Sequence, residues 1–254
     1  MIKQKSLRIF FRSFFIQSFW NREGLQNIGF AYMIMPFVRE IYKDSSEKFI
    51  SVMKRHLDHF VTNPYLSSAV AALVIYREEE LAKNGGGDAR ELSTFKRYLS
   101  ASIAAIGDSV IWGCLRPVNS IVGCLPFFLF ADKISSSLIL VSLFFYLFFY
   151  NLITLSIRYW SGFLAFKYKM QMLVLIKRLP VALFRNILCV CGLIVCIFSA
   201  GFYWLKYGGD LMDKAAGFIF LACFLIFKMF NFSTIFVFLM GLAVSFVITY
   251  LGIL

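Results

Sequence analysis

The amino-acid sequence predicts an all-α protein that crosses a membrane several times. Hydrophobic residues make up 60% of its 254 residues and charged residues only 16%, whereas about a quarter of the residues of an average soluble protein are charged. The chain also contains 31 phenylalanines. Its second half carries apolar runs of about twenty residues, the length that a helix needs to cross a hydrocarbon layer roughly 30 Å thick.

Residues 1–100 predict a helical region in the cytoplasm or in the membrane interface, because most acidic residues lie here and no apolar run reaches spanning length. Apolar and basic residues alternate between positions 7 and 19. This pattern predicts an amphipathic helix that either lies in the headgroup plane or packs on the protein's own core. Apolar residues at helical spacing in Asn27–Tyr42 and Ser45–Phe60 predict two further helices.

The chain is expected to break at Asn63-Pro64, since proline disfavours helix in the residue before it. The next stretch, Tyr65–Tyr76, is rich in serine and alanine, which allow helices to pack closely. The acidic cluster Glu78–Glu80 follows directly. Such clusters usually lie on a solvated face, and we expect this of at least one of the three residues.

Residues 101–254 predict a transmembrane region with about five membrane segments. The predicted segments are Ile103–Phe130, Leu138–Ile157, Asn186–Trp204, Gly217–Phe230 and Ile235–Leu254. The first of them either crosses the membrane or re-enters on the same side, and the fourth is short for a span.

A polar stretch at Gly107–Pro117 interrupts the first of these segments. It holds two opposite charges, Asp108 and Arg116, in almost charge-free surroundings, where an unpaired charge is costly. On a regular helix their spacing corresponds to about 12 Å of rise, too far for a direct pair. We therefore expect a broken or re-entrant helix, with breaks at Gly107, Gly113 or Pro117, that lets the charges approach each other or a polar solute. The alternative is a structural ion pair at a helix corner.

The basic residues indicate topology. The net charge is +12, but the basic residues flank apolar spans, which favours contact with anionic lipid over nucleic acid. The link from Arg158 to Arg185 is the most basic one, so we expect this link and the N-terminus in the cytoplasm. All six cysteines lie in apolar runs without metal-ligand spacing. We expect them to pack as thiols, and we expect no metal site and no cofactor.

Short motifs spread along nearly the whole chain carry a family resemblance. They are Arg12-Ser13, Ser18–Asn21, Gln26–Phe30, Pro36, Arg39, Tyr42, Arg55–Leu57, Phe60, Thr62–Tyr65, Glu78-Glu79, Gly107-Asp108 with Trp112-Gly113 and Arg116–Val118, Asn151, Arg158-Tyr159 and Leu251-Gly252. In order and spacing these residues resemble the enzyme IID membrane component of the mannose/fructose/sorbose family of the bacterial phosphotransferase system (PTS).

The resemblance implies a multi-pass subunit of the bacterial plasma (inner) membrane that pairs with a IIC partner in a hetero-oligomer and forms a path for hexose. Soluble IIA and IIB proteins would phosphorylate the sugar as it arrives, so this chain is not expected to be an enzyme. His56 and His59 are therefore not predicted to be phosphohistidines. His56 matches a family position, and we expect it to be a hydrogen-bonded structural residue.

The chain also departs from the family pattern. Ala101–Ala105 replaces a run rich in glycine and proline before Asp108, Ser109 replaces a proline, and Trp160–Lys169 replaces a glycine-rich stretch. The element before Asp108 is thus expected to be stiffer and more regularly helical. These departures keep open a second hypothesis, a divergent membrane scaffold or receptor subunit that does not transport.

The leading hypothesis assigns the polar residues to a sugar path or to its structural support. Trp112 offers a flat apolar face on which a pyranose ring can rest, although core packing or an interfacial anchor is the simpler interpretation. A membrane-embedded enzyme has little support, because no Ser/His/Asp or HExxH arrangement is present. The candidate residues are Asp108, Arg116, Trp112, Asn63, Glu78, Glu79, Asn151 and Arg158, with Gly107, Gly113, Pro117 and Pro64 as breaks.

Overall fold

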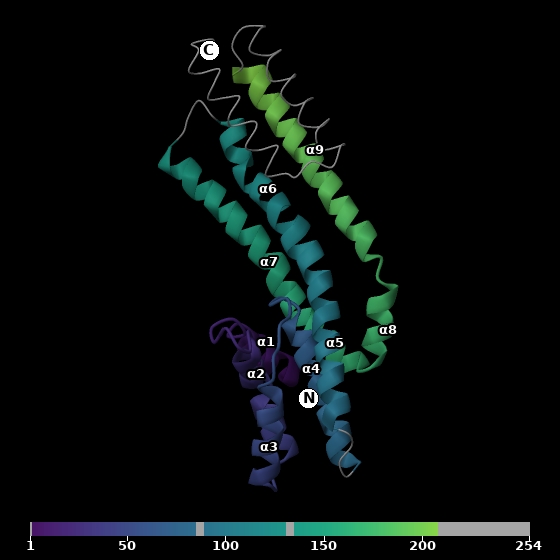
Figure 1. Ribbon diagram of the computed structural model, residues 1–254. Coiled ribbons are helices and arrows are strands. Elements are labelled where there is room, and N and C mark those ends of the chain that lie inside the picture. The colour runs from purple at the N-terminus through teal and green to yellow at the C-terminus, as the bar shows by residue number, and fades with distance from the viewer. Residues whose placement is uncertain (1, 85–88, 131–134, 208–254) are drawn as a thin grey trace. The chain divides into compact units, whose positions relative to one another are not determined.

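The computed structural model describes residues 2–84, 89–130 and 135–207, and these residues are helical apart from short connections (Figure 1). Isolated bridges join Leu25 to Asn21 and Phe60, and the described residues form no strand. The all-α prediction is thus confirmed for this part of the chain. The elements are α1 Ile2–Ser13, α2 Asn27–Ile41, α3 Ser46–His56, α4 Ser67–Lys83, α5 Ala89–Gly107, the π-helix η1 Asp108–Leu115, α6 Arg116–Leu129, α7 Ser136–Tyr168, α8 Gln171–Arg178 and α9 Val181–Tyr207.

The chain divides into two compact units. The first comprises Met1–Phe127 and Asp132–Cys196, and the second comprises Phe128–Ala131 and Ile197–Leu254. All candidate residues belong to the first unit. The predicted spans Gly217–Phe230 and Ile235–Leu254 lie outside the described residues.

Three helices among the described residues are long and apolar enough to cross a membrane. They are Arg90–Pro126, which runs through α5, η1 and α6, then Ser136–Tyr168 and Val181–Ser199. They coincide with the first three predicted segments. Only 11% of the most apolar part of Ser136–Tyr168 is buried inside the protein. Its aromatic side chains, such as Phe144 and Phe148, point outward, as expected of a helix that faces lipid or another membrane protein.

The core of the first unit is built around α4. This helix packs against α1, α2, α5 and α7, and its alanines Ala69, Ala71 and Ala72 are almost completely buried. The approach to α7 is close, because a Cβ added at Gly162 would lie 3.0 Å from the Cβ of Ser68. The small residues therefore bring two helices together as their composition predicts.

Helix α1 packs on this core with one face only. Ser6, Ile9 and Ser13 are buried, whereas Leu7 and Phe11 are exposed. The interpretation as a helix packed on the protein's own core is thus confirmed, since its buried face contacts α4 and α7. Its opposite face leaves apolar side chains exposed, and its location in the headgroup plane stays a prediction.

The irregularity expected at Gly107–Pro117 is present but takes another form. The helix neither turns back nor breaks, because Gly107 and Arg116 both have α-helical backbone angles. Between them the helix widens to π spacing, and the Arg116 N–H donates to the carbonyl of Ile111 five residues earlier. Pro117 has no N–H to donate and would crowd the carbonyl four residues before it in a regular α-helix, so the irregularity lies directly upstream of this proline. Arg116 and Asp108 consequently remain on one continuous helix.

Candidate functional site

The centre of the candidate site is the contact between Asn63 and Asp108. Asn63 is 1% exposed, and its Nδ2 donates to Asp108 Oδ1 over 2.9 Å. Its own Oδ1 accepts the backbone N–H of Tyr65 over 3.1 Å, which orients the amide. The break before α4 thereby holds the first residue of η1, and the carboxylate of Asp108 remains exposed on its other side.

Gly107 makes this contact possible. A Cβ at this position would lie 2.4 Å from Cγ of Asn63, whereas a Cβ at Gly113 would meet nothing closer than the Asp108 carbonyl oxygen at 3.3 Å. The absence of a side chain at Gly107 therefore leaves the space that the Asn63 amide occupies. Gly113 has no such role. Neither glycine acts as a chain break, and Pro117 lies inside the first turn of α6.

Arg116 and Trp112 follow Asp108 along the same helix. Both are exposed, Trp112 by 43%. No ion pair joins Asp108 to Arg116 in the described part of the chain, so neither the approach of these charges to each other nor the alternative of a structural ion pair is found, and the approach to a polar solute stays a prediction. The physical reason is the continuous helix, which keeps them about two turns apart.

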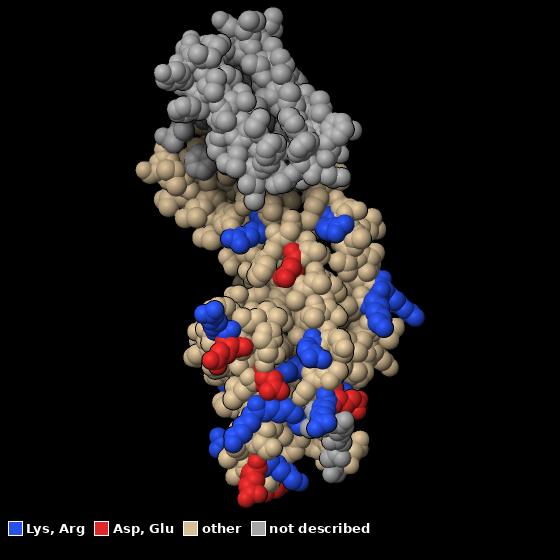
Figure 2. Space-filling model, viewed as in Figure 1, with Lys and Arg blue, Asp and Glu red and all other residues tan. Residues whose placement is uncertain are grey.

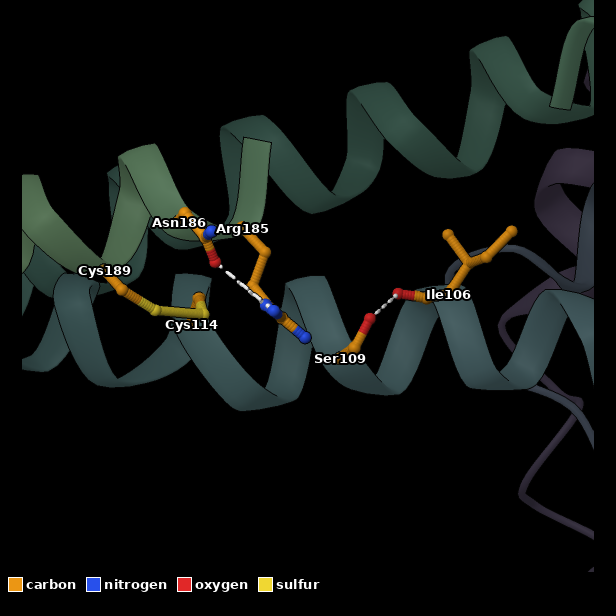
Figure 3. Close-up of a disulfide and its surroundings, with 6 residues drawn as sticks. All are labelled: Ile106, Ser109, Cys114, Arg185, Asn186 and Cys189. Carbon is orange, nitrogen blue, oxygen red and sulfur yellow. Dashed lines mark hydrogen bonds between the residues drawn. A yellow bond between two sulfur atoms is a disulfide. The ribbon is translucent and has the colours of Figure 1, made fainter. Parts of the chain in front are cut away.

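A disulfide fastens this helix to α9. Cys114 in η1 is bonded to Cys189 in α9, with the Cα atoms 5.8 Å apart. Figure 3 shows the bond and, beside it, the side chain of Arg185 extending from α9 toward η1. The prediction that all cysteines pack as thiols is therefore wrong for this pair. The reason is packing, since α9 lies close enough to η1 to bring residues 75 positions apart into bonding distance.

A second polar cluster surrounds Glu78, which is completely buried. Its Oε1 accepts hydrogen bonds from Arg55 and from His56 Nε2, the latter over 2.8 Å. Its Oε2 accepts from the hydroxyl of Tyr42 over 3.1 Å. Three elements, α3, α4 and the end of α2, are thus held by one carboxylate, and His56 is hydrogen-bonded as the sequence predicted.

The buried position shifts the pKa values of this cluster. Burial raises the pKa of Glu78, but the hydrogen bonds and charges of His56 and Arg55 together outweigh it and hold the pKa below its ordinary value. Burial lowers the pKa of His56, against the opposing effect of Glu78. Burial and the neighbouring Glu78 raise the pKa of Tyr42 to about 12. Glu78 is therefore ionised near neutral pH, and His56 is neutral.

The remaining candidates lie apart from these two clusters. Glu79 accepts from Lys5 Nζ over 2.7 Å at the surface. Arg158 is 7% exposed, and its Nη1 donates to the Ser13 carbonyl oxygen over 2.6 Å, which ties α7 to α1. Asn151 is exposed and donates to the Leu147 carbonyl oxygen of its own helix. Pro64 is buried beside Asn63.

In Figure 2, most of the charged side chains on the visible face of the first unit lie over the end formed by α1 to α5. Beyond this end, the surface of the apolar helices carries few charged side chains. Asp108 and Arg116 belong to one of these apolar helices, Arg90–Pro126. A carboxylate and a guanidinium on such a helix need a polar environment from water or from another protein.

Comparison with known proteins identifies the family. The sequence model of the PTS system mannose/fructose/sorbose family IID component matches residues 1–198. The chain belongs to this family. The mannose-specific EIID component of Escherichia coli K12 is 31% identical over 161 residues, which cover 63% of this chain and 54% of that relative. The fructose permease IID component of Bacillus subtilis 168 is 32% identical over 123 residues, 48% of this chain and 44% of that relative.

The chain thus spans about half the length of the curated relatives it matches. Two solved structures have the same fold over 98% of the chain. One is a cryo-EM structure of the mannose transporter ManYZ with microcin E492, with 19% identity, 96% of that chain covered and a TM-score of 0.58. The other is described as a membrane protein, with 18% identity, 97% covered and a TM-score of 0.71.

Several residues of this IID component were not singled out from the sequence as site residues. Tyr42 and Arg55 bind Glu78, and they were visible only as family matches. Tyr65, just before α4, and Tyr150 in α7 bring their hydroxyls within 3.1 Å of each other. Lys96 is buried without any sequence pattern that indicates it. These contacts depend on helix packing, which single-sequence periodicity does not specify.

Proposed function

We propose that this IID component is a membrane subunit of a PTS sugar permease that forms, with a IIC partner, the path for hexose uptake. Phosphorylation is assigned to IIA and IIB proteins, and no phosphoryl group is carried by this chain. The observation that carries the proposal is an exposed Asp108, oriented by buried Asn63, on a helix apolar enough to cross a membrane. Family membership supplies the context.

The chemistry of this cluster suits a carbohydrate. The exposed carboxylate of Asp108 can accept hydrogen bonds from sugar hydroxyls, and the exposed indole of Trp112 offers an apolar face to a pyranose ring. Arg116 on the same helix adds an exposed donor. Such groups are costly in lipid, so they are expected to face a polar path or a partner subunit.

A second candidate function is a scaffold or receptor subunit that does not transport. One observation favours it: α5 continues as a regular α-helix through Ala101–Ala105, where the family has glycine and proline. A stiffer helix before Asp108 limits hinge motion. Sugar-dependent phosphorylation in vesicles that contain this chain with its IIC, IIA and IIB partners distinguishes the two functions.

The test residue is Asp108. Asp108→Asn keeps the shape and one hydrogen bond but removes the charge. We expect uptake of the transported hexose, identified from mannose, fructose and sorbose, to fall about tenfold, because a hydrogen bond to a charged group is worth roughly 1.5–3 kcal/mol. Radiolabelled sugar uptake in cells measures the effect.

The matched control is Asp44→Asn, which removes a carboxylate from an exposed position outside the apolar helices. Its uptake should equal that of the wild type. Copurification with the IIC partner establishes that both variants assemble. Wild-type uptake by a normally assembled Asp108→Asn complex would exclude Asp108 from the sugar path.

A further inference from the structure

A small polar pocket lies between the end of α3 and the first turns of α5. Its volume is about 190 Å³, smaller than the range of roughly 300–1,000 Å³ that is usual for drug-sized ligands. Its lining combines two hydroxyls, an imidazole, two basic side chains and one carboxylate. The lining residues are Asp58, His59, Ser93, Thr94, Lys96 and Arg97.

Lys96 is the unusual member of this group. It is 2% exposed, and its Nζ has no hydrogen-bond partner. A buried ammonium without a partner is costly, and the ring of Phe30, 5.6 Å from Nζ, compensates only in part. The ammonium group of Lys96 is therefore suited to binding an anion.

The nearest buried carboxylate does not supply that anion. Both oxygens of Glu78 are already occupied, Oε1 by Arg55 and His56 and Oε2 by Tyr42. The described residues form no ion pair to Lys96. The pocket lining thus contains two basic side chains, Lys96 and Arg97, and one carboxylate, that of Asp58, so its formal charge is positive.

The pocket belongs to the polar part of a long helix. The helix Arg90–Pro126 has 37 residues, about 55 Å at the usual rise, which exceeds a hydrocarbon layer of roughly 30 Å. Its charged first turns, which contain Lys96 and Arg97, therefore extend beyond the hydrocarbon, where a water-soluble ion can reach them.

We propose that this pocket binds a phosphate oxyanion, as inorganic phosphate or as the phosphate of a small phosphomonoester. The hydroxyl of Thr94 and the guanidinium of Arg97 are donors of the kind that recognise phosphate oxygens, and Lys96 supplies the buried charge. The site is separate from the Asn63 and Asp108 cluster. The inference does not depend on the transport function, because its test measures phosphate binding and not sugar uptake.

The first experiment is a titration of the purified full chain in phosphatidylcholine nanodiscs with inorganic phosphate and with a hexose 6-phosphate, followed by calorimetry and thermal melting. We expect saturable binding of at least one of them and a rise in Tm at saturation. The same titration in nanodiscs that contain phosphatidylglycerol distinguishes the source of the phosphate. Unchanged binding assigns the pocket to a soluble phosphate. Binding that is lost there even at high salt, where the general repulsion by the anionic lipid is screened, assigns it to a lipid headgroup. Failure to bind in both nanodiscs overturns the proposal.

Variants separate this site from a structural lysine. Lys96→Met removes the charge at similar length, and we expect phosphate affinity to fall at least tenfold while the Tm without phosphate is unchanged or higher. Lys54→Met, on an exposed position of α3 that does not line the pocket, should bind as the wild type does. Asp58→Asn should bind phosphate several-fold more tightly, because it removes the opposing carboxylate.

Arg97→Gln and Thr94→Val provide the same test if Lys96→Met does not fold, and each should weaken binding. Wild-type affinity in Lys96→Met, or in both of these variants, would refute the site. Lys96 would be a structural residue if Lys96→Met retained phosphate binding but, without phosphate, melted well below Lys54→Met.

Discussion

At the scale of single residues, two adjacent glutamates test how burial determines the energy of an ion pair. Glu78 is buried against Arg55 and His56, whereas Glu79 forms a partly exposed pair with Lys5. Glu78→Gln leaves the guanidinium of Arg55 without its charged partner. We expect it to lower the free energy of unfolding by about 3 kcal/mol, because breaking a buried pair is strongly destabilising. Thermal melting in detergent measures the change.

Glu79→Gln is the control, since it removes the same charge one position away. Its effect should be below about 1 kcal/mol, the usual value of an exposed pair. Equal losses in the two variants would show that the Glu78 cluster contributes no more than a surface ion pair.

The same cluster predicts a loss of stability in acid. Burial lowers the pKa of His56 below its ordinary value of 6.5, so the unfolded chain binds a proton that the folded chain does not, and stability falls as the pH drops below about 6.5. Glu78 adds a further loss below its ordinary pKa of 4.5, because its folded pKa is also lowered. We expect the Tm to fall between about pH 7.5 and pH 5.5, and to fall less in His56→Gln. If the Tm of His56→Gln fell with decreasing pH as steeply as that of the wild type, the assignment of this loss to His56 would be contradicted.

At the scale of elements, the contact of the chain break before α4 with the start of η1 depends on one glycine. Gly107→Ala places a Cβ against Asn63, and Gly113→Ala has more space. We expect the first variant to lose about 1–3 kcal/mol of stability through overpacking and to weaken the Asn63 to Asp108 hydrogen bond. The second should be neutral, or stabilising by up to about 1 kcal/mol, because alanine favours helix. Melting curves of the two variants, measured side by side, test this difference in stability. Equal Tm values would contradict the role given to Gly107.

The elements also show what the sequence is able to predict. Apolar run length located α7 and α9, and small residues predicted the close packing of α4. The glycines and proline around Asp108 predicted an irregular helix, but not that backbone angles would stay helical and absorb the irregularity as π spacing. The contacts that this widened helix makes with Asn63 and α9 come from residues far away in the chain, which the local pattern does not show.

At the scale of the whole molecule, the sequence indicated the class of protein and its family, whereas the grouping of the polar residues needed the structure. Asn63 and Asp108 were both candidates, but the sequence did not indicate that they are in contact, because they lie 45 positions apart. Arg158 was a candidate for the path or for its structural support, and its hydrogen bond to Ser13 fastens α7 to α1. Charge in an apolar surrounding therefore identifies important residues without showing whether they bind a solute or another helix.

The ties between α1, α4 and α7 also constrain topology. Because Arg158 binds Ser13 and α7 packs on α4, we expect the N-terminal helices and the end of α7 to lie on the same side of the membrane. The link from there to α9 is basic, with Lys169, Lys177 and Arg178, so by the positive-inside rule we expect this side to face the cytoplasm.

We therefore expect Asp44→Cys and Lys177→Cys, each in a cysteine-free background, to react with a membrane-impermeant maleimide in inside-out vesicles and not in intact cells. Both positions are exposed, so a lack of reaction reports sidedness and not burial. Detergent-solubilised protein, in which both must react, is the control. Labelling of the two positions from opposite sides would contradict the shared location of α1 and the end of α7, and labelling of both from outside would invert the orientation.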